Sequence, residues 1–424
     1  MKKAPSPLVS LIPIVVLVLL LFATIRTFGS DALSGGSQVS LLTTTAICIL
    51  IGMVFYKIPW KDYELAITNN IAGVATAIII LLIIGALSGI WMISGVVPTL
   101  IYYGMQIIHP SFFLASTCII CALISVMTGS SWTTIATIGI ALMGIGKAQG
   151  FEDGWIAGAI ISGAYFGDKI SPLSETTILA SSITDTPLFR HIRYMMITTV
   201  PSLIITLIIF TVAGLSHDAS NTQHIAEVAT ALNEKFHITP WLLIVPVATG
   251  ILIARKVPSI VTLFLSTLLA GVFALIFQPE LLQEISGVAV SGFDSLFKGL
   301  MMTVYGATNL HTDNAVLTDL IATRGMAGMM NTIWLILCAM CFGGAMTASG
   351  MLGSITSIFV RFMKKTVSVV GATVCSGLFL NLTTADQYIS IILTGNMFRD
   401  IYAKKGYESC LLSRTTEDAV TVTS

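Results

Sequence analysis

The sequence predicts an all-α, polytopic membrane protein, and three observations support this fold class. Of its 424 residues, 55% are hydrophobic and only 10% are charged, whereas a soluble domain has about 25% charged residues. The mean hydropathy is +0.91. Apolar runs of about 20 residues, the length that crosses a hydrocarbon core of about 30 Å, recur along the chain. No basic patch interleaved with aromatic residues indicates nucleic acid, so the lipid bilayer is the expected surrounding partner.

The apolar runs predict ten spans, and broken helices or re-entrant hairpins between them bring the expected total to about 10–12 transmembrane helices. The first run, at 8–25, follows Lys2 and Lys3 but is long and lacks a small-residue cleavage site. We interpret it as an uncleaved first helix rather than a signal peptide. The expected spans are 8–28, 38–56, 70–94, 110–128, 154–167, 194–214, 240–254, 258–277, 330–349 and 366–380.

Basic loop residues predict the orientation of these spans. Loops rich in Lys and Arg stay on the cytoplasmic side, and the acidic segments 215–239 and 278–287 are expected outside. We therefore expect a multi-pass protein of the cell (inner) membrane with a cytoplasmic N-terminus. The basic positions that mark cytoplasmic turns are Lys57, Lys61, Arg190, Arg193, Arg255 and Lys256.

The chain also contains a partial copy of itself. Short segments of the first half recur in the second half at a nearly constant offset, which is the signature of a repeat architecture. Secondary transporters are often built from two repeats, commonly inverted, with binding sites at the repeat interface. Chance similarity between two apolar stretches is the alternative. The matches at an offset of 255 or 256 are 89–95 with 344–350, Thr128 with Thr383, and 150–152 with 406–408.

Past these matches the alignment has two versions. The preferred version makes the second copy shorter and places 167–168 near 417–418, so that an acid is kept; the other pairs 173–177 with 412–416. We expect two repeats in inverted topology and four regions along the chain. These are N-terminal transmembrane helices (1–69), transport repeat 1 (70–193), linking helices with a polar segment (194–324) and an incomplete transport repeat 2 (325–424).

One polar stretch of the first repeat indicates a cation site. Ionisable residues at bilayer depth cost at least ~2.5–3.5 kcal/mol each, so they mark positions that bind or move something. Pro172 has no N–H; if the segment is helical, the carbonyl of Asp168 is left free beside its own carboxylate. Nearby hydroxyls complete an oxygen cage for a small hard cation. The candidate binding and coupling residues are Asp168, Ser171, Ser174, Glu175 and Thr176.

Two further polar clusters, at 128–134 and 381–387, each lie between apolar runs. Backbone that leaves helix geometry inside a bilayer must be buried in protein or line a cavity. Interhelical packing is the alternative role for single Ser or Thr residues, but an acid there needs a partner. The candidate residues are Ser130, Ser131 and Thr133 in the first cluster and Thr383, Thr384 and Asp386 in the second.

A third cluster contains Asn309 and Asp313, which are four residues apart and would share a helical face. An ion-pathway role and a solvated helix end are equally compatible with it. The two C-x-x-C pairs, at 118–121 and 338–341, lie inside apolar runs, where cysteines serve as small packing residues. The chain has no H-E-x-x-H and no phosphate-binding G-x-x-x-x-G-K-[ST] sequence. We therefore expect no enzyme activity and no cofactor.

Several segments resemble the NhaC-type sodium/proton antiporter family, within the wider ion-transporter superfamily. The Asp168 motif is the most specific part of a resemblance that covers nearly the whole chain. The family usually carries a Thr-Gly-Asn sequence where this chain has 312–314, and it continues past Ser424, so we expect this chain to end before the family's C-terminal helix. The segments that carry the resemblance are 89–95, 163–177, 329–337, 384–388 and 412–418.

The resemblance implies a secondary transporter that exchanges Na⁺ for H⁺. With the polar residues above, it predicts alternating access at a carboxylate-centred site that holds either cation, with Asp168 as the Na⁺ ligand. The alternative is a Na⁺/H⁺-coupled organic-acid antiporter of the malate/lactate type, for which Lys169 is available to a carboxylate substrate. The sequence leaves the oligomeric state open, a homo-oligomer included.

Overall fold

The computed structural model describes residues 5–216, 222–288, 290, 292–308, 310, 312, 317–318, 321–355, 366–384 and 387–423, and this described part contains helices and no strand. The chain divides into two compact units, each assembled from separate stretches of sequence. Unit 1 comprises Met1–Ile78, Thr176–Tyr194 and Met330–Ser424, and unit 2 comprises Ile79–Glu175 and Met195–Met329.

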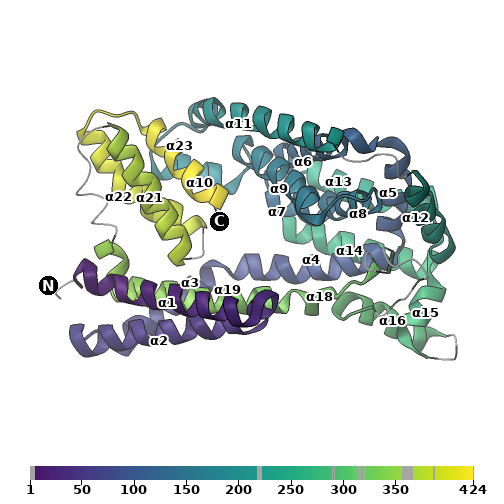
Figure 1. Ribbon diagram of the computed structural model, residues 1–424, viewed down its shortest axis with the longest axis horizontal. Coiled ribbons are helices and arrows are strands. Elements are labelled where there is room, and N and C mark those ends of the chain that lie inside the picture. The colour runs from purple at the N-terminus through teal and green to yellow at the C-terminus, as the bar shows by residue number, and fades with distance from the viewer. Residues whose placement is uncertain are drawn as a thin grey trace. The chain divides into compact units, whose positions relative to one another are not determined.

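Unit 2 is built from helix pairs around one apolar core. In it α6 packs on α9, α5 on α8, α13 on α14 and α15 on α16 (Figure 1). The core is lined by fully buried side chains such as Trp91, Phe113 and Leu282. The helices are α4 (Ala75–Ile93), α5 (Val96–Ile107), η2 (Pro110–Phe112), α6 (Phe113–Thr128), α7 (Ser131–Thr134), η3 (Ile135–Gly139), α8 (Ile140–Ala148), α9 (Asp153–Ile170), α11 (Leu188–Ser216), α12 (Thr222–Lys235), η4 (Pro240–Leu243), α13 (Ile244–Ala254), α14 (Ser259–Phe277), α15 (Pro279–Ser286), α16 (Phe293–Tyr305) and α18 (Gly325–Gly328).

Unit 1 contains two groups of helices and the first two turns of α11. In one group α19 packs on α2 and α3, and α1 packs on α2; in the other, α21, α22 and α23 pack against one another (Figure 1). Its elements are α1 (Pro7–Phe28), η1 (Gly29–Ser34), α2 (Gly36–Tyr56), α3 (Trp60–Gly73), α10 (Glu175–Ile183), α19 (Met330–Ala348), α21 (Thr366–Thr384), α22 (Gln387–Lys404), α23 (Ser409–Val420) and η5 (Thr421–Thr423).

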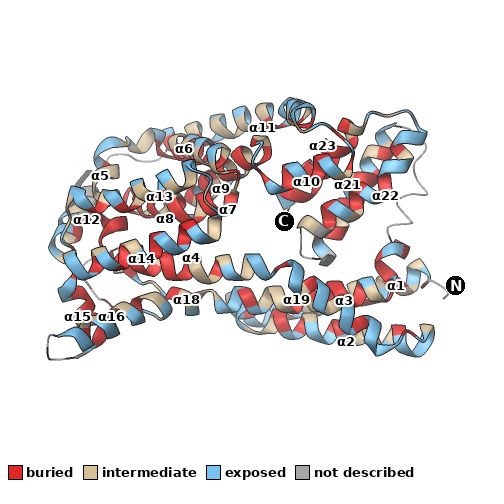
Figure 2. Ribbon diagram, turned by 180° about the vertical axis from the view of Figure 1, so that it is seen from behind, coloured by how far each residue is buried: buried red, intermediate tan, exposed pale blue. Residues whose placement is uncertain are grey.

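Every predicted span overlaps a helix, although 70–94 begins in the last turn of α3 and crosses into α4, and this confirms the all-α polytopic fold class. Seven described helices are long and apolar enough to cross a membrane, or eight if Glu227–Lys235 and Pro240–Ala254, bent by 90°, form one span. The expected 10–12 crossings therefore need the shorter helices as well. Many residues of α1 and α11 are exposed (Figure 2). They include large apolar residues such as Phe22 and Ile205. Such apolar surface is suited to lipid.

Glycines set the close approach of α6 and α9. A Cβ atom on Gly163 would overlap the carbonyl oxygen of Cys118, and one on Gly167 would overlap that of Ala122. Small residues four apart allow two helix backbones to touch in this way. Cys118 and Cys121 are both buried, and the Cys121 side chain lies at the Gly163 contact. The first C-x-x-C pair thus occupies a packing position.

Helix boundaries recur along the chain at the offset of the sequence repeat. The helices α4 (Ala75–Ile93) and α19 (Met330–Ala348) begin and end 255 residues apart, and the glycines after them, Gly95 and Gly350, both have positive φ, 85° and 70°. Three further boundaries lie 256 residues apart. These are the ends of α6 and α21, the beginnings of α7 and α22, and the beginnings of α9 and α23. This recurrence supports two repeats. It fits a second copy that is not shortened up to residue 409, and the alignment of 167–168 with 417–418 beyond that residue stays a prediction. Inverted topology stays a prediction.

Candidate cation site

The polar cluster at 128–134 lies at a break between two helices. The first helix, α6, ends at Thr128, and the next residue, Gly129, has φ +66°, a conformation that favours glycine. Ser130 is extended and caps α7, because its Oγ accepts hydrogen bonds from the Thr133 N–H at 3.2 Å and the Thr133 hydroxyl at 3.1 Å. The chain then runs through the π-helical turn η3 into α8. Ser130 and Ser131 thereby lie between the end of α6 and the beginning of α7.

A second break follows Asp168. The helix α9 ends at Ile170, two residues before Pro172, which cannot donate an N–H to a helix. The Ser171 N–H donates to the Asp168 carbonyl at 3.2 Å. The expectation of a free Asp168 carbonyl is therefore wrong: the segment is not helical through Pro172, and the turn at Ser171 supplies the missing donor. The next helix, α10, begins at Glu175.

The two breaks touch each other inside unit 2. The Ser171 hydroxyl donates to the Val126 carbonyl at 2.8 Å, which supplies a donor to a carbonyl in the last turn of α6. A Cβ atom on Gly129 would come within 2.6 Å of the Leu173 carbonyl carbon. Two features therefore favour glycine at position 129: its positive φ, and the Leu173 backbone, which leaves no room for a Cβ atom.

The Asp168 carboxylate lies between these breaks. Its residue is 7% exposed, and its Oδ2 accepts a hydrogen bond from the Ser131 hydroxyl at 2.8 Å. The Ser131 N–H and the Ser174 hydroxyl also donate to it, and the exposed Glu175 is close enough to interact with its charge. A hydroxyl can rotate to offer its oxygen instead of its hydrogen. Carboxylate and hydroxyl oxygens suit a small hard cation, so the arrangement can hold either a proton or such an ion.

The remaining predicted residues are placed as follows. Thr176 is buried at the start of α10 and belongs to unit 1. Thr383 and Thr384 end α21, but their side chains are not described. Asn309, Asp313 and Asp386 lie outside the described residues. The structure thus brings together Asp168, Ser131, Ser174 and Glu175, with Ser171, Ser130 and Thr133 in the two adjoining breaks.

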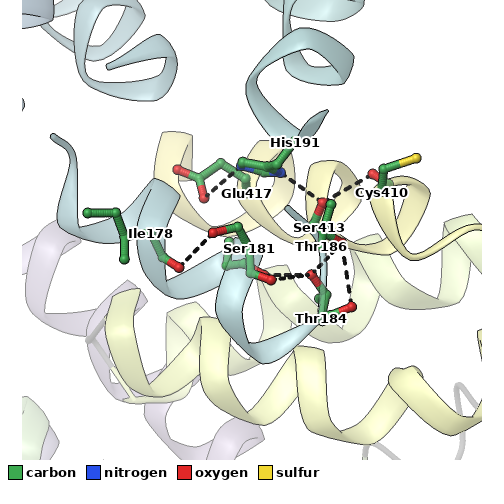
Figure 3. Close-up of polar contacts among 9 residues, drawn as sticks. Ile178, Ser181, Thr184, Thr186, His191, Cys410, Ser413 and Glu417 are labelled. Carbon is green, nitrogen blue, oxygen red and sulfur yellow. Dashed lines mark hydrogen bonds and ion pairs between the residues drawn. The ribbon is translucent and has the colours of Figure 1, made fainter. Parts of the chain in front are cut away.

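A second buried acid, in unit 1, was missed as a site residue. Figure 3 shows His191, from the start of α11, between Ser413 and Glu417 of α23. The His191 Nδ1 lies 2.8 Å from the Ser413 Oγ, and its Nε2 lies 4.0 Å from the Glu417 Oε2, with both side chains 0% exposed. The signal available in the sequence was the spacing of Ser413 and Glu417, which at four residues share a helical face. His191 carries no comparable local signal.

Known proteins resemble this chain over most of its length. The family model described as Na⁺/H⁺ antiporter family matches residues 163–424. The Na(+)/H(+) antiporter NhaC of Bacillus subtilis is 35% identical over 90% of this chain and 82% of its own. The NhaC of Alkalihalophilus pseudofirmus is 37% identical over 89% and 79%. The Malate-2H(+)/Na(+)-lactate antiporter of B. subtilis is 36% identical over 91% and 80%. The chain therefore belongs to the Na⁺/H⁺ antiporter family, as its NhaC-type motifs indicated.

Proposed function

We propose that this protein exchanges Na⁺ for H⁺ across the membrane by alternating access, with the Asp168 carboxylate binding either ion. One observation carries the proposal: a buried carboxylate, at a helix break, is surrounded by two hydroxyls and an N–H. When the site releases its proton, these donors hold the negative charge, and Na⁺ can then neutralise it. Because proton and Na⁺ compete for one carboxylate, binding of one requires release of the other. Family membership supports the same exchange.

Asp168→Asn tests this role. The amide keeps the size of the side chain but cannot exchange a proton for Na⁺, so we expect Na⁺-induced proton movement to vanish. The chain should still insert, since removing a buried charge removes a desolvation cost. The measurement is Na⁺-induced dequenching of a pH dye in everted vesicles. Asp168→Glu should retain some exchange with an altered Na⁺ affinity.

The matched control is Asp153→Asn in the same helix. Asp153 opens α9, is exposed, and forms an ion pair with Lys147 at 3.2 Å. This variant should exchange Na⁺ at the wild-type rate. Wild-type exchange by Asp168→Asn would contradict the assignment and move the coupling carboxylate to Glu175, Asp313 or Asp386.

Na⁺/H⁺-coupled exchange of organic acids is the second candidate function. Lys169 is 6% exposed and directly follows Asp168, so a positive charge is available near the site to a carboxylate substrate. A relative at 36% identity is named a malate/lactate antiporter. Adding malate or lactate to the same vesicles distinguishes Na⁺/H⁺ exchange from exchange coupled to an organic acid. Proton movement that requires an organic acid, and is absent with Na⁺ alone, would favour this second function.

A further inference from the structure

Buried hydroxyl groups collect inside the three-helix group formed by α21, α22 and α23 in unit 1. These helices all pack against one another (Figure 1). Each contributes one hydroxyl that is 0% exposed and has no hydrogen-bond partner among the described residues. Burying a polar group without a partner costs free energy, and hydroxyls that gather at one level can share a ligand that supplies the missing bonds. The three unpartnered hydroxyls are those of Ser376 in α21, Thr394 in α22 and Thr416 in α23.

The apolar core of the group ends where these hydroxyls begin. A buried cluster contains Ala372 of α21, Phe398 of α22 and Leu412 of α23. Each unpartnered hydroxyl lies four residues from the member of this cluster on its own helix. Residues four apart share a helix face. The three hydroxyls therefore lie on the faces that these helices turn toward one another, one turn from the apolar cluster.

Contacts between the helices place the three hydroxyls on the same side of that cluster. The Thr373 hydroxyl lies 3.1 Å from the Tyr402 hydroxyl, and four residues further along α21 a Cβ atom on Gly377 would lie 3.7 Å from the Thr394 Oγ1. The same Cβ atom would lie 3.5 Å from the Ala419 Cβ of α23. Because α22 thus runs opposite to α21, the three unpartnered hydroxyls come within about one helical turn of the same level.

Polar groups continue from this level toward the exposed end of the group. The buried Tyr402 hydroxyl is bonded to the Thr373 hydroxyl, and the Thr415 hydroxyl also interacts with it. Further out, the Tyr407 hydroxyl lies 2.9 Å from the hydroxyl of the exposed Thr366. The rings of Tyr402 and Tyr407 are 5.8 Å apart. A series of hydroxyls therefore leads from the surface to the buried level.

In the other direction the polar groups lead toward the end of α21. The Asn381 amide nitrogen donates to the Val420 carbonyl and to the Thr423 hydroxyl, both at 3.1 Å. Its Oδ1 is buried and has no partner within the described part of the chain. Together with the three unpartnered hydroxyls, this oxygen forms what we call the polar layer. Asn381 lies one turn before Thr384, the end of α21, which corresponds to the end of α6 beside the Asp168 site in the first repeat.

The occupant of the polar layer has to donate and accept hydrogen bonds. Neighbouring hydroxyls give their hydrogens to carbonyls of their own helix, as Thr373 and Thr415 do at 2.9 and 2.7 Å. The three unpartnered hydroxyls make no such bond, so each has a hydrogen to donate as well as lone pairs to fill. The Asn381 Oδ1 can only accept. A cation would leave the hydrogens without an acceptor, whereas water both donates and accepts and commonly bridges buried polar groups.

The first repeat is apolar at the positions of the unpartnered hydroxyls. The repeats correspond here, because the Ser125 hydroxyl donates to the Ala164 carbonyl just as Asn381 donates to the Val420 carbonyl, 256 residues later. The counterparts of the three hydroxyls are isoleucines that belong to the apolar core of unit 2 or pack against it. The polar layer is therefore a difference between the repeats and not a requirement of their common fold. The counterparts, in the order α21, α22 and α23, are Ile120, Ile138 and Ile160.

The path toward the exposed end differs between the repeats in the same way. The two tyrosines of the second repeat correspond to Gly146 and Phe151 in the first. The ring of Phe151 stacks on that of Phe113 at 5.4 Å, which makes this end of the first repeat apolar. Among the counterparts of all these polar groups, the first repeat keeps hydroxyls only at Thr117 and Ser125. A continuous series of hydroxyls is thus found in the second repeat alone.

We propose that ordered water fills the polar layer and, with the hydroxyls on either side, forms a route for protons along α21, α22 and α23. Each hydroxyl or water in such a chain accepts a proton from one neighbour and passes one to the next, so that no member keeps a net charge. This inference rests on the proposed function, because it gives the protons of that exchange a route in the second repeat that the first repeat lacks.

Water in the polar layer can be measured without transport. Solid-state NMR of the full chain in lipid bilayers follows transfer of magnetisation from water protons to threonine side chains. We expect transfer to Thr394 and Thr416. The control is Thr44, which is equally buried but donates to the Ser40 carbonyl of its own helix at 2.8 Å. Transfer to Thr394 and Thr416 that does not exceed the transfer to Thr44 would overturn the proposal.

The proton route is tested by Thr394→Val, which keeps the branched shape of the side chain and removes the hydroxyl. Na⁺-induced proton movement in everted vesicles should slow by about three- to tenfold, because water still bridges part of the gap. The Na⁺ concentration for half-maximal exchange should stay the same, since Asp168 is unchanged. The ratio of the rates in H₂O and D₂O should rise, because proton transfer becomes the slower step; a packing defect alone would not raise it. Thr44→Val should change none of these quantities.

A second variant and a second measurement keep the proposal open to contradiction. If Thr394→Val fails to fold, Ser376→Ala removes a hydroxyl of the same layer from α21 and is expected to act alike. An unchanged rate and an unchanged isotope ratio in a folded variant would overturn the route. Asp168→Asn separates this inference from the proposed function: it should abolish exchange and leave the NMR transfer to Thr394 and Thr416 intact. Exchange that survives in Asp168→Asn contradicts the proposed function, whereas missing NMR transfer contradicts the water-filled layer.

Discussion

Asp168 and Glu417 are both buried carboxylates, but their surroundings differ. Asp168 lies at a helix break in unit 2 and accepts hydrogen bonds from the hydroxyls of Ser131 and Ser174. Glu417 lies inside the regular helix α23 of unit 1 and faces the imidazole of His191. A hydroxyl can turn its oxygen toward a cation, whereas an imidazole nitrogen competes with the carboxylate for a proton. Burial alone therefore does not tell which ion an acid binds; the groups opposite it do.

The backbone differs between the two places as well. Around Asp168 two helices are interrupted and their backbones touch at Gly129 and Leu173. Around Glu417, α23 is continuous from Ser409 to Val420. An interrupted helix exposes peptide groups that can bind an ion, and a continuous one keeps them in its own hydrogen bonds. The first two predictions below test the interrupted site around Asp168, and the third tests an exposed ion pair at the beginning of α23 in unit 1.

The largest effect is expected for Gly167→Ala, which adds a Cβ against the Ala122 carbonyl and the Ser125 side chain. It should push α9 away from α6, displace Asp168, lower the free energy of unfolding by about 1–3 kcal/mol and strongly reduce exchange. Thermal unfolding of the purified protein measures the loss of stability, and the vesicle assay measures the loss of exchange. Gly158→Ala is the control in the same helix, because its nearest neighbour is Phe210 at 3.9 Å. Equal behaviour of the two variants would show that the close α6–α9 contact does not hold the site.

An intermediate effect is expected for Ser131→Ala. It removes the hydroxyl that donates to Asp168 Oδ2 at 2.8 Å. A hydrogen bond to a charged group contributes about 1.5–3 kcal/mol, so the Na⁺ concentration for half-maximal exchange should rise at least about tenfold. Thr211→Ala is the control, since its hydroxyl donates only to the Leu207 carbonyl of its own helix. An unchanged Na⁺ dependence in Ser131→Ala would show that the Ser131 hydroxyl takes no part in Na⁺ binding at Asp168.

The smallest effect concerns an exposed ion pair in unit 1. The Cys410 thiol and the Arg190 guanidinium lower the pKa of Glu408 from its ordinary value of 4.5. A carboxylate with a lowered pKa stabilises the fold above its ordinary pKa, and this contribution is lost as the pH falls through the lowered value. Glu408→Gln should therefore unfold at a slightly lower temperature than wild type at neutral pH and at the same temperature in strong acid. Arg190→Gln should behave alike; a difference that persists in acid would rule out the ion pair as its cause.

Local signals made most of the fold predictable. Apolar runs gave the spans because hydropathy is read over one segment, and Pro172 and Gly129 marked the two breaks because each restricts the backbone at its own position. The pairing of Ser131 with Asp168 was not derivable, since residues 37 apart meet only through the packing of α6 on α9. The polar helix α23 carries Glu417 in a buried position that only its tertiary neighbours reveal. Asp386, Asn309 and Asp313 stay predictions.

The contact between the two breaks has a mechanical consequence. The Ser171 hydroxyl is bonded to the Val126 carbonyl, and the backbone at Leu173 lies against Gly129 with no side chain between them. Two interrupted helices joined in this way cannot slide past each other as helices separated by a layer of flexible side chains can. A displacement of one break should therefore displace the other break as well. If access to Asp168 alternates as proposed, both breaks would therefore have to move together.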